Sequence, residues 1–224
     1  MEWKNIHIAA DIVVFTVSKG VLQVLLIRRK NPPFKGQFAL PGGFVEIDES
    51  LEEAALRELE EETGVRGIFI KKIAAYGDVS RDPRGRIVSI AFMALIDSEK
   101  FRLESKVDAM EAQWVSVSSI RNLAFDHMKI LNDALSELRF EIQTTNIAAQ
   151  ILPEKFTLTE LQELYERVMG EKLDKRNFRK RIKALDILAS TRETKMEGAH
   201  RPALLYRFRS RSYRALKDRI HVFV

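Results

Sequence analysis

Residues 57–64 read RELEEETG and place three glutamates within about one helical turn. Glu58, Glu61 and Glu62 are three and four positions apart, so their carboxylates share one side of a helix. Each like-charged pair at this spacing costs an isolated helix about 0.2–0.5 kcal/mol. The face is therefore either solvated or bound to a cation. Hard divalent cations such as Mg²⁺ take oxygen ligands and bind carboxylates together with substrate phosphates, so a metal site is the chemistry this spacing indicates.

The glutamates belong to a longer pattern. It begins at Gly43, continues with Glu49 and Arg57, and ends at Gly64 and Val65. The pattern resembles the Nudix box, Gly-x5-Glu-x7-Arg-Glu-U-x-Glu-Glu-x-Gly-U, where U is a bulky aliphatic residue, and every defined position is filled. A Glu-rich helix alone is usually a solvated surface, but nine defined positions over 23 residues are not a common coincidence.

The resemblance implies a metal-dependent hydrolase that attacks a nucleoside diphosphate linked to another group. It implies that Glu58, Glu61, Glu62 and the Gly43 carbonyl bind Mg²⁺ or Mn²⁺, and that Arg57 pairs with Glu49 to fix the catalytic helix. Water would be activated by a box glutamate such as Glu58 or Glu61, or by a carboxylate outside the box. Asp108 and Glu111, just before Trp114, are the outside candidates, and for Glu111 a surface acid is the favoured interpretation.

Arginines that could bind the phosphates or stack on a base lie in the stretch GDVSRDPRGR, residues 77–86. They are Arg81, Arg84 and Arg86, and Arg29 at the end of an apolar segment has the same potential. A polar hairpin turn explains the loop equally well, because Asp-Pro and Gly are turn residues. Both interpretations of these four arginines stay open.

The elements that must position these side chains form an α/β mixture. Val-, Ile- and Leu-rich segments at 7–17 and 21–30 predict a hairpin. Ser50 followed by Glu53 forms a capping box, so a helix is expected from Leu51 to Gly64. Further strands are expected at 65–76, 86–97 and 114–117, and helices at 118–123 and 126–141. Because strands pair first as hairpins, this is not a regular βαβ repeat.

The last quarter of the chain is basic. Residues 171–224 carry 16 Lys+Arg and 6 Asp+Glu, whereas residues 1–170 carry 21 Lys+Arg and 26 Asp+Glu. A capped amphipathic helix from Thr157 to Gly170, a basic helix after Asp174 and a basic hairpin follow one another, which is the order of a winged helix-turn-helix. Such charge indicates a polyanion, although a solvated tail or a protein-contact module would also fit it. The candidate DNA-binding residues are Lys175, Arg176, Asn177, Arg179, Lys180, Lys183 and Arg201, with Arg192 and Lys195 also on the wing.

The chain as a whole resembles Nudix-related transcriptional regulators. The matching stretches, besides the box, are YGDVSRDPRGR, LAFDHMKIL, LPEKFTLTELQELYERVMGEKLDKRNFRKRI and RPALLYRF. The resemblance implies a Nudix fold with a mixed sheet between helices over residues 1–145, and a winged-helix DNA-binding domain over 146–224. It also implies a homodimer on double-stranded DNA whose Nudix domain senses ADP-ribose or a related nucleoside diphosphate derivative.

Three functions compete on these observations. The chain is a ligand-responsive DNA-binding regulator that keeps hydrolytic capacity, or mainly an ADP-ribose-type pyrophosphatase with an accessory basic domain, or a sensor-repressor without turnover. Many such regulators have decayed boxes, whereas this box is intact, so the first function is favoured. With no cysteine, no signal-peptide pattern and no apolar run near the ~20 residues needed to cross a bilayer, a cytoplasmic protein without membrane contact is expected.

Overall fold

The computed structural model describes residues 5–104, 111–196 and 202–216. The chain divides into two compact units, Met1–Thr16 with Gln23–Ser136, and Val17–Leu22 with Glu137–Val224. The expected α/β fold class, a mixed sheet with helices followed by a winged helix, is confirmed. Within the described ranges, no helix is long and apolar enough to cross a membrane.

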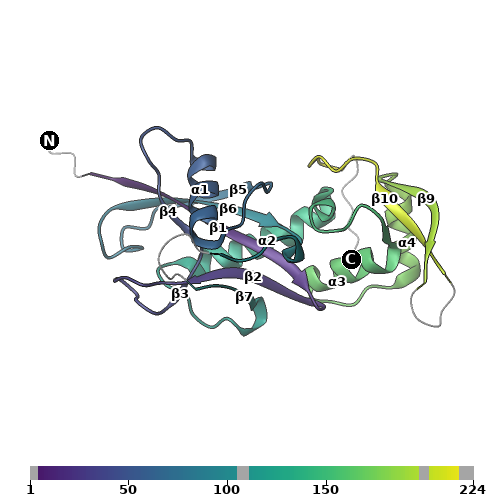
Figure 1. Ribbon diagram of the computed structural model, residues 1–224, viewed down its shortest axis with the longest axis horizontal. Helices are drawn as coiled ribbons and strands as arrows, with labels where there is room; N and C mark the ends of the chain where they lie inside the picture. The colour runs from purple at the N-terminus through teal and green to yellow at the C-terminus, as the bar shows by residue number, and fades with distance from the viewer. Residues whose placement is uncertain (1–4, 105–110, 197–201, 217–224) are drawn as a thin grey trace. The chain divides into compact units, whose positions relative to one another are not determined.

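A mixed sheet forms the frame of the first unit, with its elements labelled in Figure 1. The strand order is β3-β2-β1-β6-β5, with β4 paired to β1 and β7 paired to β2. β1 and β6 are parallel, while β4, β5 and β7 are antiparallel to their neighbours. The strands are β1 His7–Ser18, β2 Val21–Arg28, β3 Phe38–Ala39, β4 Gly42–Phe44, β5 Lys71–Tyr76, β6 Ile87–Leu95 and β7 Ala112–Ser116.

Helix α1, Leu51–Thr63, is the expected capped helix. The Ser50 hydroxyl accepts from the Glu53 N–H and the Glu53 side chain accepts from the Ser50 N–H, and Gly64 ends the helix in the left-handed region. Its apolar side packs on β1 and β6, where Leu59 joins a core with Ile12 and Phe92. Burying a leucine contributes about 1.5–3 kcal/mol, so one face of α1 is fixed to the sheet. Glu62 is buried beside Gly42 of β4, while Glu58 and Glu61 are partly exposed.

Helix α2, His127–Thr144, extends from the first unit into the second, because the division between the units falls after Ser136. The remaining elements of the second unit are β8 Phe156–Thr157, α3 Leu158–Met169, α4 Lys175–Ala184, β9 Leu188–Lys195 and β10 Ala203–Phe208. The three strands form a small sheet in the order β8-β10-β9. Tyr165 of α3 meets Phe178 of α4 edge to face at 5.3 Å, which fixes the two helices together.

Two expected elements differ from the structure. The helix expected at 118–123 is a single 3₁₀ turn, Val117–Ser119. Here the Ser119 hydroxyl donates to the Ser116 carbonyl, a local bond that competes with helix formation. The strand expected from residue 65 begins only at Lys71, because Gly67 has a positive φ and turns the chain.

Candidate functional site

Arg57, in the middle of helix α1, organises the carboxylates of the Glu-rich pattern. Its guanidinium donates to both oxygens of Glu49 at 2.7 and 2.9 Å, to Glu58 at 2.9 Å and to the Phe44 carbonyl at 3.1 Å. These hydrogen bonds lower the pKa of Glu49 to about 2 and raise that of Arg57. The pairing of Arg57 with Glu49 that the family resemblance implies is therefore present, and it ties the loop before α1 to the helix.

The glycine loop brings backbone against the glutamates. The Gly42 N–H donates to Glu62 at 3.0 Å, and a Cβ added at Gly43 would collide with the Glu58 carboxylate. Gly42 has a φ of 151°, and a side chain there would collide with the Ala10 carbonyl. Only glycines allow the loop to approach the carboxylates this closely.

Glu58 and Glu62 are buried enough for their charge to be costly. Burial raises the pKa of Glu62 to about 8 against the opposing hydrogen bond from Gly42, and it raises the pKa of Glu58 against the opposing charge of Arg57. A divalent cation beside these oxygens would reverse both shifts. The donor set, carboxylates on one helix face beside a backbone loop without side chains, suits Mg²⁺ or Mn²⁺.

The carboxylates are not arranged around a common centre as they stand. No three acidic or histidine side chains in residues 5–104, 111–196 and 202–216 are already placed to hold a metal ion. Glu58 instead pairs with Arg57, and Glu61 lies 3.6 Å from the same guanidinium. The residues fit a metal by chemistry and proximity, and binding requires Glu58 and Glu61 to turn from Arg57.

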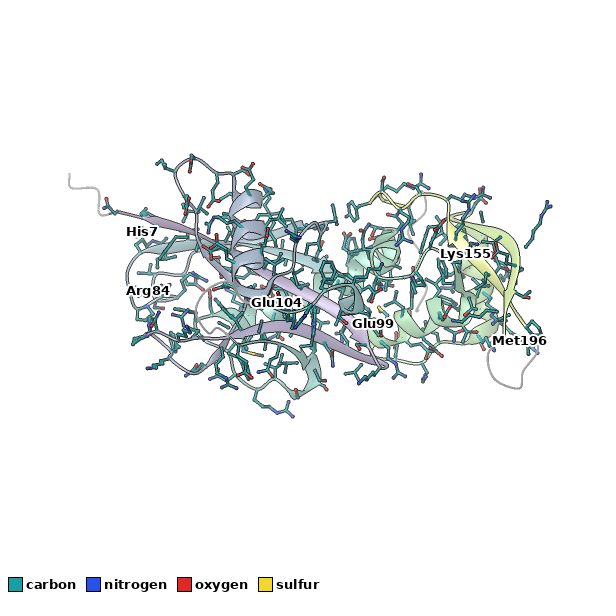
Figure 2. All side chains as sticks on the ribbon, viewed as in Figure 1. His7, Arg84, Glu99, Glu104, Lys155 and Met196 are labelled. Carbon is teal, nitrogen blue, oxygen red and sulfur yellow. The ribbon has the colours of Figure 1, made fainter. Side chains whose placement is uncertain are left out.

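A cavity of about 80 Å³ lies beside the glycine loop. Two of the arginines expected to bind ligand line it and stack on aromatic rings: Arg29 lies 4.7 Å from the Phe125 ring centre, and Arg84 lies 5.1 Å from Phe44. Figure 2 labels Arg84. Arg84 also pairs with Asp82, which holds the pKa of that buried acid below its usual range despite desolvation. Pockets for drug-sized ligands span about 300–1,000 Å³, so these side chains must move to admit a nucleotide.

Arg81 also lines the cavity but is almost fully buried. It makes a two-pronged pair with Asp126 at 2.7 and 3.0 Å and reaches Asp11 at 3.4 Å. Although burial acts to lower the pKa of Arg81, Asp126 and Asp11 raise it. Ser89 donates to Asp11 at 2.5 Å, so this acid has hydrogen-bond partners on two sides.

His127 completes the buried polar network. Its Nδ1 accepts from the Leu40 N–H at 2.9 Å, and its Nε2 lies 3.6 Å from Asp11. Burial lowers the pKa of His127, so the imidazole is neutral with its proton on Nε2. Asp11, Asp126 and His127 belong to no spacing motif. Asp126 and His127 lie in the stretch LAFDHMKIL, where the signals are its match to the family and the position of these two polar residues among apolar ones.

The other predicted residues lie elsewhere. Asp108 lies outside the described residues, and so does Arg201. Glu111 is exposed and pairs with Arg28 at 3.3 Å. Arg86 donates to the Gly77 carbonyl at 2.6 Å, across the base of its own loop.

The basic helix α4 presents a cationic surface in the second unit. Phe178 and Ile182 are buried in the core, and the exposed residues include Lys175, Arg176, Asn177, Lys180 and Lys183. Asp174 caps the helix by accepting from the Asn177 N–H at 2.8 Å. On the wing, Arg192 is exposed and Lys195 pairs with Glu160 at 2.7 Å. Lys155, labelled in Figure 2, precedes β8 and pairs with Glu193 of β9.

A groove of about 630 Å³ separates α4 from β10. Lys175, Arg179 and Lys183 line one side, and Thr159 and Tyr206 are among the other lining residues. Arg179 reaches the Thr159 hydroxyl at 3.4 Å, and its buried Nε has no hydrogen-bond partner among the described residues. Cations of a basic helix that face a groove are suited to phosphate contacts.

Comparisons with known proteins also divide the chain into two parts. Residues 5–134 match the family model of the NUDIX domain, and residues 148–208 match that of the NrtR DNA-binding winged helix domain. The chain is 37% identical over 207 residues to the ADPR responsive transcriptional repressor NtrR of Acinetobacter baylyi, covering 91% of this chain and 82% of that protein.

Two further matches cover half of the chain and nearly all of it. An ADP-ribose pyrophosphatase of Methanocaldococcus jannaschii is 47% identical over 111 residues, which is 50% of this chain and 64% of that protein. The crystal structure of Shewanella oneidensis NrtR complexed with a 27mer DNA superposes with a TM-score of 0.82 at 32% identity, covering 96% of this chain and 99% of that one.

Proposed function

Because the chain belongs to the NUDIX family and also carries an NrtR DNA-binding winged helix domain, we propose that it is a DNA-binding repressor that responds to ADP-ribose or a related nucleoside diphosphate derivative. One observation carries this proposal. The same chain has an arginine-lined cavity beside a complete carboxylate set and, in its other unit, a helix whose cations face solvent.

In the ligand site, Arg29 and Arg84 are the residues proposed to hold the nucleotide, because each combines a guanidinium with an adjacent aromatic ring. Arg81 and Arg86 are proposed as secondary contacts. Glu58, Glu61, Glu62 and the Gly43 carbonyl would hold Mg²⁺ or Mn²⁺. When bound, such cations neutralise the diphosphate and promote attack by water.

We further propose that pyrophosphohydrolase capacity is retained, since no position of the box is lost. Arg57 keeps Glu49 and the helix in register, as their hydrogen bonds support. Glu58, Glu61 or Asp108 would receive the proton of the attacking water. A hydrolase with an accessory basic domain and a sensor without turnover remain the competing functions, and the exposed cations of α4 speak against the first of these.

On DNA, α4 is proposed to enter the major groove with Arg176 and Asn177 near its N-terminus, while the remaining basic residues contact phosphates. These are Lys175, Arg179, Lys180, Lys183 and Arg201. A homodimer with one helix on each half-site is the proposed assembly. The family matches that end at residue 134 and begin at residue 148 support a domain boundary near 145.

The experiment that tests the proposal is a DNA titration of the full chain with and without ADP-ribose. The duplex is one that the protein itself selects from a random-sequence library, followed by fluorescence anisotropy. We expect saturating ADP-ribose to change the Kd for DNA by at least about fivefold, the lower end of typical coupling. Tight DNA binding that ADP-ribose leaves unchanged would contradict the sensor function, while absence of selected DNA would favour the hydrolase.

A further inference from the structure

The first turn of α2 is bonded to three separate segments that line the cavity. Asp126 holds Arg81 of the β5–β6 loop through two hydrogen bonds. His127 accepts from the Leu40 N–H, at the start of the glycine loop, and faces Asp11 of β1 at 3.6 Å. Arg81, Leu40, Asp11 and His127 all line the cavity themselves.

The other end of α2 is bonded to the DNA-binding elements. Arg139 donates to the Val168 carbonyl in the last turn of α3 at 3.2 Å, and α3 in turn packs on α4 through Tyr165 and Phe178. Glu141, buried in the same half of α2, accepts from the Tyr213 hydroxyl at 2.6 Å. Asn146, just after the helix, binds three backbone groups of residues 210–214.

Between these ends α2 is one continuous helix of 18 residues with no proline or glycine inside it. At 1.5 Å per residue it is about 27 Å long, and helices bend sharply only at identifiable defects. A shift of its first turn is therefore carried to its last turn rather than absorbed along the way.

The cavity supplies a reason for such a shift. Arg81 is shared between two carboxylates, and an incoming diphosphate is a third anion that competes for the same guanidinium. A cavity of about 80 Å³ must enlarge to take a nucleotide, and Arg81 and the Leu40–Gly43 loop form part of its wall. A displacement of either would change the bonds to Asp126 and His127. The ligand would then have a different interaction energy in the two arrangements, as any conformational response requires.

We infer that Asp126 and His127 are positioning residues that couple the ligand cavity to the DNA-binding unit through α2. This inference rests on the proposed function and deepens it. In this inference the two residues transmit the signal from the cavity to the DNA-binding unit. They are not required for ligand affinity, and they do not contact DNA.

The test compares variants of the full chain by their coupling ratio, the Kd for DNA with saturating ADP-ribose divided by the Kd without it. Asp126→Asn weakens the pair with Arg81, and His127→Gln removes the acceptor from the Leu40 N–H. Two matched controls accompany them. His127→Asn keeps an acceptor oxygen near the position of Nδ1, and Tyr76→Phe removes a different tether of α2, the 2.9 Å hydrogen bond from Tyr76 to Asp133.

We expect a wild-type ratio that departs from one by at least about fivefold. Asp126→Asn and His127→Gln should bring it within about twofold of one, while both variants still bind ADP-ribose and DNA separately. His127→Asn and Tyr76→Phe should keep the wild-type ratio. A residue that serves only folding would lower the melting temperature and leave the ratio unchanged.

Two results would overturn the inference alone: a wild-type ratio retained by Asp126→Asn and His127→Gln, or an equal loss in Tyr76→Phe, since any tether of α2 would then suffice. A wild-type ratio of one would instead overturn the proposed function, and the inference with it. If Asp126→Asn does not fold, the comparison of His127→Gln with His127→Asn decides the question.

Discussion

The arginines at the ligand site of the first unit and the cations of α4 in the second are used in opposite ways. In the first unit Arg57 and Arg81 are paired with carboxylates, and Arg81 is almost completely buried. In the second unit Arg176 and the lysines of α4 face solvent. Paired and buried guanidinium groups hold a site in a fixed geometry. Exposed cations are available to a polyanion, and no existing ion pair has to be broken when they bind it.

This difference in how the positive charges are held indicates what each binding surface needs. A nucleotide site must place a few charges accurately, and the Arg57 side chain does this through three hydrogen bonds to carboxylates and a fourth to the Phe44 carbonyl. A DNA surface needs a high density of positive charge on a stable helix, and α4 obtains it by burying only Phe178 and Ile182. The predictions below test each side of this comparison.

The largest effect is expected at the carboxylate helix. Glu62→Gln should lower Mg²⁺-dependent release of AMP from ADP-ribose by about 10²–10³-fold, the usual loss when one group that stabilises developing charge is removed. Glu60→Gln, on the same helix and at an undefined position of the box, is the matched control and should keep full activity. Turnover undiminished in Glu62→Gln would mean that the carboxylate set is not the reactive site.

Next in size is the stability lost with the buried pair. Arg81→Ala leaves Asp126 and Asp11 without their cation, and breaking such a pair costs about 3–5 kcal/mol of unfolding free energy. Arg102→Ala removes an exposed pair with Glu104 and should cost no more than about 1 kcal/mol. Midpoints of urea unfolding for the two variants measure this, and equal losses would contradict the contrast between buried and exposed arginines.

A smaller effect is expected on DNA binding. Arg176→Ala should weaken binding by about fivefold or more if it reads a base, or lower the salt slope of log K by about 0.9 if it contacts a phosphate. Arg66→Ala is the control, because this arginine is also largely exposed but belongs to the first unit. Titrations at several salt concentrations give both quantities, and identical curves for Arg176→Ala and wild type would place the interface elsewhere.

The last effect concerns pH. Burial raises the pKa of Glu62 to about 8, so its contribution to stability is fully present below the unfolded pKa near 4.5 and is lost as pH rises through about 8. In EDTA, the melting temperature of wild type should therefore fall relative to that of Glu62→Gln between pH 5 and 9. The expected change is several degrees, at about 2–4 °C per kcal/mol for a chain of this size.

How far the sequence predicts the molecule depends on how local each feature is. The carboxylate helix could be predicted with its cap, its end and its pairing of Arg57 with Glu49, because all these residues lie within one short segment. The winged helix could be recognised from the order of its capped helices and basic hairpin. The start of β5 and the 3₁₀ turn at Val117–Ser119 were misjudged, since Gly67 and the Ser119 hydroxyl decide them locally against the apolar pattern.

The polar network of the cavity could not be predicted in the same way. Asp11, Arg81 and Asp126 come from three segments more than 40 residues apart, and only the pairing of β1 with β6 and the start of α2 bring them together. For Arg81 the sequence left a ligand contact and a polar turn equally open, because a loop arginine looks alike whether it is free or paired. Its burial depends on Asp11, which nothing in the sequence distinguishes from a surface acid in a strand.

The central claim is that the cavity of the first unit and the basic helix of the second act on one another. Calorimetric titration of ADP-ribose into the free protein and into its saturated complex with the selected duplex tests this most directly. The account predicts two different affinities, whose ratio equals the factor by which ADP-ribose changes the affinity for DNA, because coupling is reciprocal. Equal affinities for ADP-ribose in the two titrations would contradict it.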